Sequence, residues 1–97
     1  MSTSPANILR ESVEIANRRG LHARASAKFV NTVAALPDTV QVTVWKDGTE
    51  AKGGSILGLM MLGAAKGDTI EICVAGDQAD AALAQLVELV KDRFGEE

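Results

Sequence analysis

The sequence predicts an α+β fold: a two-layer, open-faced β-sandwich in which three helices cover one face of a four-stranded antiparallel sheet. Segments with the period of half-buried strands and segments with helical period follow one another in the order β-α-β-β-α-β-α. An Asp-Gly pair between the second and third strands marks a tight hairpin. When the fourth strand lies between the first and the second, all neighbouring strands are antiparallel, which gives the strand order 1-4-2-3.

The strand segments alternate apolar and polar residues. The first covers residues 12–16, the second residues 39–46, the third, after the Asp47-Gly48 turn, about residues 49–52, and the fourth residues 68–75. We expect the helices to cover the valine and isoleucine face of this sheet. The opposite, solvent-facing side would carry Glu14, Gln41, Thr43, Trp45, Glu71 and Cys73.

The helical segments have apolar residues three and four apart. The first helix covers residues 23–36 and ends before Pro37, and a short second helix begins with the capping-type Ser55 and stops at Gly63. The last helix has Asp77 as its expected cap. Its apolar face comprises Leu83, Leu86, Val87, Val90 and Phe94. Only the first ten residues and the C-terminal "GEE" are expected to be loosely held.

The composition is that of one globular domain over residues 1–97, with an ordered core at about residues 12–94. A chain of 97 residues can bury one hydrophobic core but not two, and 46% hydrophobic with 24% charged residues is ordinary for a globular protein. No apolar run approaches about 20 residues, so no membrane insertion is expected. The N-terminal "MSTSPANILRES" lacks the pattern of a secretory signal, which predicts a cytoplasmic protein.

Charge and cysteine content exclude two further classes. A net charge of -3 with one Trp and two Phe provides neither the charge nor the stacking residues of a nucleic-acid binder. One cysteine and one histidine cannot form a four-ligand zinc site, so we expect no metal and no cofactor.

The stretch "NRRGLHARAS", residues 17–26, contains the single histidine, His22. Gly20 permits a sharp turn before it, and the helical pattern begins directly after it at Ala23. Between Glu14 and Asp38 the chain has no acidic side chain but carries Arg18, Arg19, Arg24 and Lys28. Free backbone amides at the helix start, together with Arg24, suit a small anion such as phosphate.

A neutral imidazole is also a nucleophile. A phosphoryl group on a nitrogen of His22 could be held by the backbone amides of Ala23 and Arg24 without being locked in, which suits a carrier. The alternative is that His22 merely caps a helix and that the arginines form a solvated turn. The local pattern leaves both readings open.

The segment "SILGLMML" is too apolar for one face of a short helix to bury. We expect Ile56, Leu59 and Met60 to face the core, and some of Leu57, Met61 and Leu62 to remain at the surface. Exposed Leu and Met would suit docking of several partners, whereas loops or the first helix could instead cover them.

The motifs "GLHAR" and "SILGLMMLG", with Ser55 placed 33 residues after His22, resemble those of the bacterial histidine-containing phosphocarrier proteins (HPr) of the phosphoenolpyruvate-dependent phosphotransferase system. The resemblance covers about residues 12–94. It implies that His22 accepts a phosphoryl group from enzyme I on Nδ1 and passes it to enzyme IIA domains, and that Arg24 steadies that group. The protein would be a substrate of enzymes rather than an enzyme.

The resemblance also assigns a docking surface and a regulatory site. Leu57 and Met61, with Arg24 and Lys28, would meet the partners, and Ser55 matches the serine that an HPr kinase/phosphorylase modifies in many family members. Ala25 stands where the family usually has proline. Alanine keeps a backbone N–H that proline lacks and does not preset the first helical turn. We therefore expect either the extra amide or the looser turn to change how long phosphate stays on His22.

Two other functions remain open. The first is a regulatory protein of the nitrogen-related phosphotransferase branch, which acts mainly by phosphorylation-dependent binding of partner and regulatory proteins rather than in sugar transport. The second is a small binding domain of similar fold without phosphate chemistry. We expect the phosphocarrier to be a monomer.

Overall fold

The computed structural model describes residues 8–96. The expectation of a loosely held N-terminus falls, for residues 1–7, outside the described residues. The elements in chain order are β1 (Ile8–Glu14), α1 (Ala23–Ala34), β2 (Gln41–Lys46), β3 (Thr49–Lys52), α2 (Ile56–Met61), β4 (Thr69–Ala75), α3 (Ala79–Lys91) and the short turn η1 (Arg93–Gly95). The predicted order β-α-β-β-α-β-α is confirmed.

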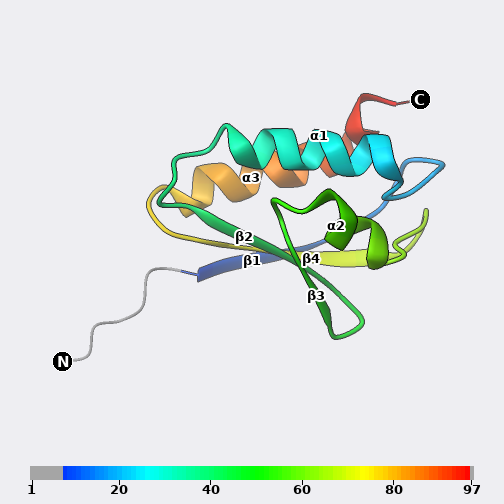
Figure 1. Ribbon diagram of the computed structural model, residues 1–97, viewed down its shortest axis with the longest axis horizontal. Helices are drawn as coiled ribbons and strands as arrows, with labels where there is room; N and C mark the ends of the chain where they lie inside the picture. The colour runs from blue at the N-terminus through cyan, green and yellow to red at the C-terminus, as the bar shows by residue number, and fades with distance from the viewer. Residues whose placement is uncertain (1–7, 97) are drawn as a thin grey trace.

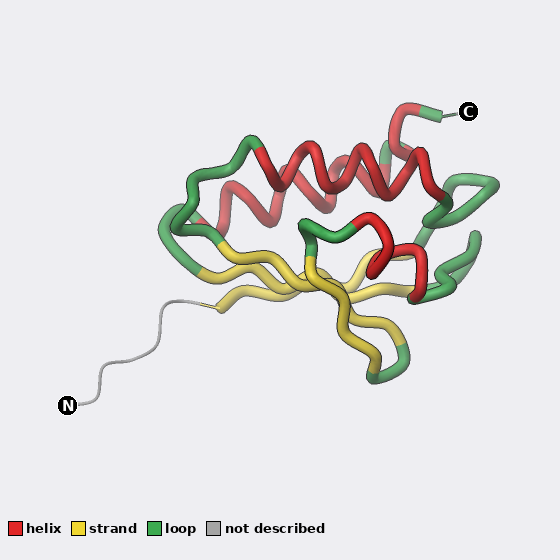
Figure 2. Tube along the Cα trace, viewed as in Figure 1, coloured by secondary structure: helices red, strands yellow, loops and turns green. Residues whose placement is uncertain are grey.

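The four strands form one antiparallel sheet in the order β1-β4-β2-β3, as predicted. The three α-helices lie together on one face of this sheet (Figures 1 and 2). Asp47 and Gly48 have φ angles of 49° and 82°, so both central residues of the hairpin are left-handed, as a two-residue type I′ turn requires.

The core lies between the sheet and the helices. Val44, Ile72 and Val74 are fully buried from the sheet side, and Phe29 of α1 and Leu86 of α3 are buried from the helix side. The other face keeps its polar residues partly or fully exposed. Alternation along each strand therefore produces a sheet with one covered and one open face.

The first strand starts earlier than predicted. Residues 8–10, expected to be loosely held, pair with the end of β4, with Ile8 opposite Ala75 and Arg10 opposite Cys73. The seven residues of β4 provide backbone partners that the alternation of the first segment alone does not reveal. The partner strand thus decides the length of β1.

Two predictions for the last helix were wrong. Its N-cap is Gln78, in the left-handed conformation at φ 59° and without a side-chain cap bond, and not Asp77. Phe94 lies outside the helix, because α3 ends at Lys91 and Arg93 and Phe94 follow with φ angles of 59° and 55°. This left-handed turn still buries the Phe94 side chain completely. The aromatic ring therefore packs in the core although Phe94 is not part of the helix.

The assignment of faces on α2 also needs correction. Leu59 is buried as predicted, but Ile56 and Met60 are 41% and 40% exposed, whereas Leu62 is buried. The helix has only six residues, and Leu59 is the one position within it whose side chain is buried in the core. Leu62, its C-cap, reaches the core from the helix end.

Candidate functional site

His22 is the N-cap of α1, as the sequence predicts. Its backbone is extended, with φ -79° and ψ -178°, and the helix begins at Ala23. The Nδ1 atom of the ring accepts a hydrogen bond from the backbone N–H of Arg24 at 3.3 Å. Since the first amides of a helix have no intrahelical acceptor, the ring stands beside the donors that hold anions at helix starts.

The loop before His22 is held tightly against the loop that precedes β4. Gly20 has φ 67°, and the N–H of Leu21 donates to the carbonyl of Ala64 at 2.9 Å. A Cβ atom at Gly20 would collide with that carbonyl oxygen and lie 2.8 Å from the Cα of Ala65. This contact brings Lys66, two residues beyond Ala64, to the side of His22.

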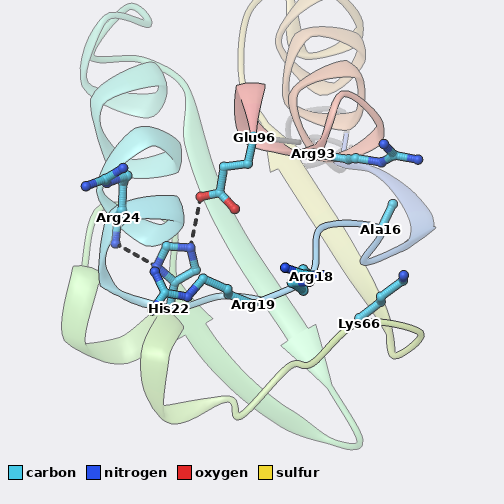
Figure 3. A pocket seen from close by; sticks show the side chains of 8 residues that line it. All are labelled: Ala16, Arg18, Arg19, His22, Arg24, Lys66, Arg93 and Glu96. Atoms are coloured by element: carbon cyan, nitrogen blue, oxygen red, sulfur yellow. Dashed lines mark hydrogen bonds and ion pairs between the residues drawn. The ribbon is translucent and has the colours of Figure 1, made fainter.

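The other ring nitrogen of His22 contacts a carboxylate from the far end of the chain. Nε2 lies 2.9 Å from Oε2 of Glu96, and the two side chains are 22% and 19% exposed (Figure 3). The fully buried Asn17 donates from Nδ2 to Oε1 of Glu96 at 3.1 Å and to the carbonyl of Gly20 at 2.9 Å. Glu96, expected to be loosely held, is therefore part of the site, whereas Glu97, of which the same was expected, lies outside the described residues.

These two contacts indicate which nitrogen carries the proton when the ring is neutral. Neutral imidazole has one N–H donor and one acceptor nitrogen. Nδ1 faces the N–H of Arg24 and must accept, while Nε2 faces a carboxylate and must donate. The Nδ1 lone pair of His22 is thus directed at the helix start, where an incoming anion would be held.

Glu96 is ionised in this setting. Burial raises the pKa of its carboxyl, but hydrogen bonds from Asn17 and His22 and the nearby charges of His22 and Lys28 outweigh burial and lower that pKa below its ordinary value of 4.5. Glu96 is therefore a carboxylate at neutral pH.

A pocket of about 500 Å³ surrounds these groups. It is strongly cationic, and Glu96 is the single acid among its lining residues, which are Ala16, Arg18, Arg19, His22, Arg24, Lys66, Arg93 and Glu96. In Figure 3, Arg24 lies on one side of His22, and Lys66 and Arg93 lie on the other. The sequence singled out Arg18, Arg19 and Arg24 but missed Lys66, Arg93 and Glu96, because loops distant along the chain bring them in.

Lys28, predicted as a docking residue, is half-buried one turn further along α1. Its Nζ donates to the carbonyl oxygen of Phe94 at 2.6 Å. The structure thus gives Lys28 an intramolecular partner next to the turn that carries Glu96.

The second helix packs next to α1 (Figure 1) and exposes apolar side chains. Leu57 and Met61 are 68% and 75% exposed, so neither loops nor α1 cover them. Ser55 is the N-cap, as predicted, and its Oγ accepts from the backbone N–H of Gly58 at 2.9 Å. A contiguous set of exposed Leu, Ile and Met residues is typical of a protein-binding surface.

Residues 8–96 contain no cluster of three or more His, Cys, Asp or Glu side chains that could hold a metal ion. None of the helices in this range is long and apolar enough to cross a membrane. Burial and, to a smaller extent, the charge of Glu71 raise the pKa of the Cys73 thiol above its ordinary value, which disfavours the nucleophilic thiolate.

Comparison with known proteins points in one direction. A family model described as the PTS HPr component phosphorylation site matches residues 9–92. The chain is 45% identical over 89 residues to the phosphocarrier protein HPr of Neisseria meningitidis, covering 92% of this chain and 98% of the relative. It is 35% identical over 89 residues to the phosphocarrier protein NPr of Escherichia coli, with the same coverage. The crystal structure of HPr-C-His from Thermoanaerobacter tengcongensis superposes with a TM-score of 0.85 at 37% identity, covering 92% of this chain and 98% of that one.

Proposed function

We propose that this chain, which belongs to the HPr family of phosphocarrier proteins, relays a phosphoryl group through His22 from phospho-enzyme I to enzyme IIA domains. Members of this family are phosphoryl carriers of the phosphotransferase system and not catalytic enzymes. The observation that carries this proposal is the position of the His22 Nδ1 lone pair at the start of α1, inside a cationic pocket. The whole chain would act as one cytoplasmic, monomeric domain.

The transfer step uses only the ring of His22. The Nδ1 lone pair attacks phosphorus and forms the N–P bond, while the bond between phosphorus and the donor's leaving atom breaks with its electron pair on that atom. The ring keeps the proton on Nε2 and becomes positively charged. Attack by an enzyme IIA nucleophile on the same phosphorus returns the electron pair to Nδ1, so His22 ends as it began.

The surroundings hold the phosphoryl group while leaving it accessible. The backbone amides of Ala23 and Arg24 lie in the first turn of α1, where they can donate to phosphoryl oxygens. The exposed guanidinium of Arg24 can add a charge-assisted contact. Because the His22 side chain is 22% exposed, a partner can reach the phosphorus from solvent.

The exposed side chains of α2 support a docking role. Leu57 and Met61 form an apolar surface on the helix next to α1, and Arg24 and Lys28 provide positive charge on α1 itself. Enzyme I and enzyme IIA domains would bind this combined surface in turn, because flexible Met and Leu side chains adapt to more than one partner.

Ser55 is the proposed site of regulatory phosphorylation by an HPr kinase/phosphorylase. A phosphate on its Oγ would face the amide end of α2, which tolerates negative charge, and would lie at the edge of the docking surface. The added charge would weaken docking of enzyme I. A Ser55→Ala variant should receive no serine phosphate from such a kinase while His22 is still labelled by enzyme I.

The 35% sequence identity to the phosphocarrier protein NPr of Escherichia coli supports a second candidate function, a regulatory protein of the nitrogen-related branch. It would use the same His22 chemistry and differ in its partners. Transfer rates from the phosphorylated protein to a sugar-type and to a nitrogen-type enzyme IIA distinguish the two candidates.

Incubation with enzyme I and radiolabelled phosphoenolpyruvate tests the central proposal. Acid-labile phosphate should appear on the native chain and be absent from His22→Ala. Equal labelling of the two, or no labelling of the native chain, would overturn the phosphocarrier function and favour a binding domain without phosphate chemistry.

A further inference from the structure

We propose that Glu96 is a positioning residue for His22: it keeps the ring proton on Nε2, so that Nδ1 stays unprotonated and can attack phosphorus, and it compensates the positive charge that the ring gains on phosphorylation. The inference rests on the proposed carrier function. Glu96 acts through the ring and does not itself touch the phosphoryl group.

The contact pattern is that of a carboxylate that orients a histidine. Oε2 of Glu96 lies 2.9 Å from Nε2, on the opposite side of the ring from the nitrogen that accepts from Arg24. The second carboxylate oxygen, Oε1, accepts from the fully buried Asn17 at 3.1 Å. Both oxygens are thus engaged, and the carboxylate cannot rotate away from the ring without losing the bond from a buried amide.

The backbone just before Glu96 is strained, and contacts of Phe94 hold it in place. Arg93 and Phe94 are consecutive non-glycine residues with φ of 59° and 55°, a conformation that costs energy and persists only where surrounding contacts impose it. The side chain of Phe94 is completely buried, and its carbonyl accepts from Lys28 at 2.6 Å. These contacts reverse the chain after α3 and direct Glu96 at His22.

The charges in the pocket make this carboxylate distinctive. Glu96 is the one acid among lining residues that otherwise include five cationic side chains from three separate segments. A carboxylate next to the phosphoryl group would repel it, but the imidazole ring separates Glu96 from Nδ1. Glu96 can therefore favour the cationic phosphorylated ring without opposing arrival of the phosphoryl anion at the cationic side.

The charges before and after the transfer step explain the two roles of Glu96, which are to fix the tautomer of His22 and to compensate its positive charge. In the unphosphorylated protein, Nε2–H donates a hydrogen bond to the Glu96 carboxylate, which disfavours the tautomer protonated on Nδ1. When Nδ1 takes up phosphorus, no proton leaves the ring, and the new positive charge is delocalised onto Nε2–H beside Glu96. A charge-assisted bond then replaces an ordinary one.

Two variants separate the acceptor role of Glu96 from its charge. Glu96→Ala removes the acceptor, so ¹⁵N NMR of the His22 ring at about pH 8.5, where an imidazole is neutral, should show a larger share of Nδ1–H. Its rate of phosphorylation by enzyme I should fall about tenfold, the order expected for one charge-assisted hydrogen bond. Glu96→Gln keeps an acceptor oxygen and should preserve the tautomer, with a loss of only about threefold.

Glu88→Gln is the matched control, since it removes the same charge from an exposed position on α3 outside the cationic pocket. It should change neither the ring tautomer nor the rate. Thermal unfolding of each variant verifies that the fold is retained. An unchanged tautomer in a folded Glu96→Ala, or a shifted tautomer with a native transfer rate, would overturn the positioning role.

The two proposals fail separately. If the native chain receives no phosphate from enzyme I, the carrier function is wrong, yet the NMR measurement still tests the Glu96–His22 contact. If the native chain and both Glu96 variants are phosphorylated at one rate, the carrier function stands and the role of Glu96 is wrong.

Discussion

Gly20 and Ala65 approach so closely that no side chain fits between them: a Cβ atom on Gly20 would lie 2.8 Å from the Cα of Ala65. Both obstacles to a side chain, this Cα and the Ala64 carbonyl, belong to backbone and cannot move aside cheaply. The packing of these two loops sets the position of His22, two residues after Gly20, relative to Lys66.

Gly20→Ala should therefore be strongly destabilising. The substitution adds left-handed strain at φ 67° to a backbone collision, and we expect a loss of about 3 kcal/mol in the free energy of unfolding. Urea denaturation measures it. Gly54→Ala is the control, because a Cβ there meets nothing within 4 Å and needs no positive φ, so its stability should stay near native. Equal stability of the two variants would contradict this account of the loop.

The lowered pKa of Glu96 predicts a stability difference that depends on pH. A carboxyl whose pKa is lower in the folded state than its ordinary value of 4.5 stabilises the fold above that value. This contribution disappears as the pH falls through the lower, folded-state pKa. The difference in unfolding free energy between the native chain and Glu96→Gln should therefore shrink as the pH falls below about 4.5. Urea titrations across that range measure it, and a difference that grows on acidification would show that the pKa is raised.

Ala25 is expected to affect the lifetime of the phosphohistidine. It is the third residue of α1 and completely buried, and its N–H belongs to the first turn, where an anion is stabilised. Ala25→Pro removes that donor, so we expect phosphate to leave His22 about two- to fivefold faster, the equivalent of one modest hydrogen bond. The decay of isolated phosphoprotein measures the lifetime, and thermal unfolding controls for the fold. Indistinguishable lifetimes would show that this amide plays no part.

The exposed side chain of Leu57 should contribute to docking of enzyme I and little to stability. Leu57 is 68% exposed, so Leu57→Glu should unfold at nearly the native temperature while its phosphorylation by enzyme I slows about tenfold, as expected for loss of an apolar contact in an interface. Ile8→Glu is the control, because Ile8 is also exposed, at 51%, but lies on β1 away from α2. A native rate for a folded Leu57→Glu would exclude Leu57 from the docking surface.

The sheet could be predicted from the sequence because its signals are local or follow from connectivity. Alternating Val and Ile define the buried face, Asp47-Gly48 supplies the left-handed pair that the hairpin needs, and the crossovers restrict strand directions. The same holds for His22 and Ser55, since a cap depends on the residue at the boundary and on the amides directly after it.

The predictions that were wrong concern structural features that depend on contacts between residues distant along the chain. The start of β1 depends on β4, the faces of α2 depend on how a six-residue helix sits against the core, and the left-handed conformation of Phe94 depends on the burial of its side chain in that core. None of these has a periodic signal, because periodicity reports which residues prefer burial and not which partner buries them.

The sequence by itself determined the order of the elements, the buried face of the sheet and the placement of His22 at the start of a helix, because each follows from residues adjacent in the chain. Tertiary structure alone decided that Lys66 and Arg93 join the arginines of residues 18–24 and that Glu96 meets Nε2 of His22 across 74 residues. The physical reason is that a charge near the end of the chain becomes part of a site only after a buried aromatic ring and a left-handed turn have brought it there.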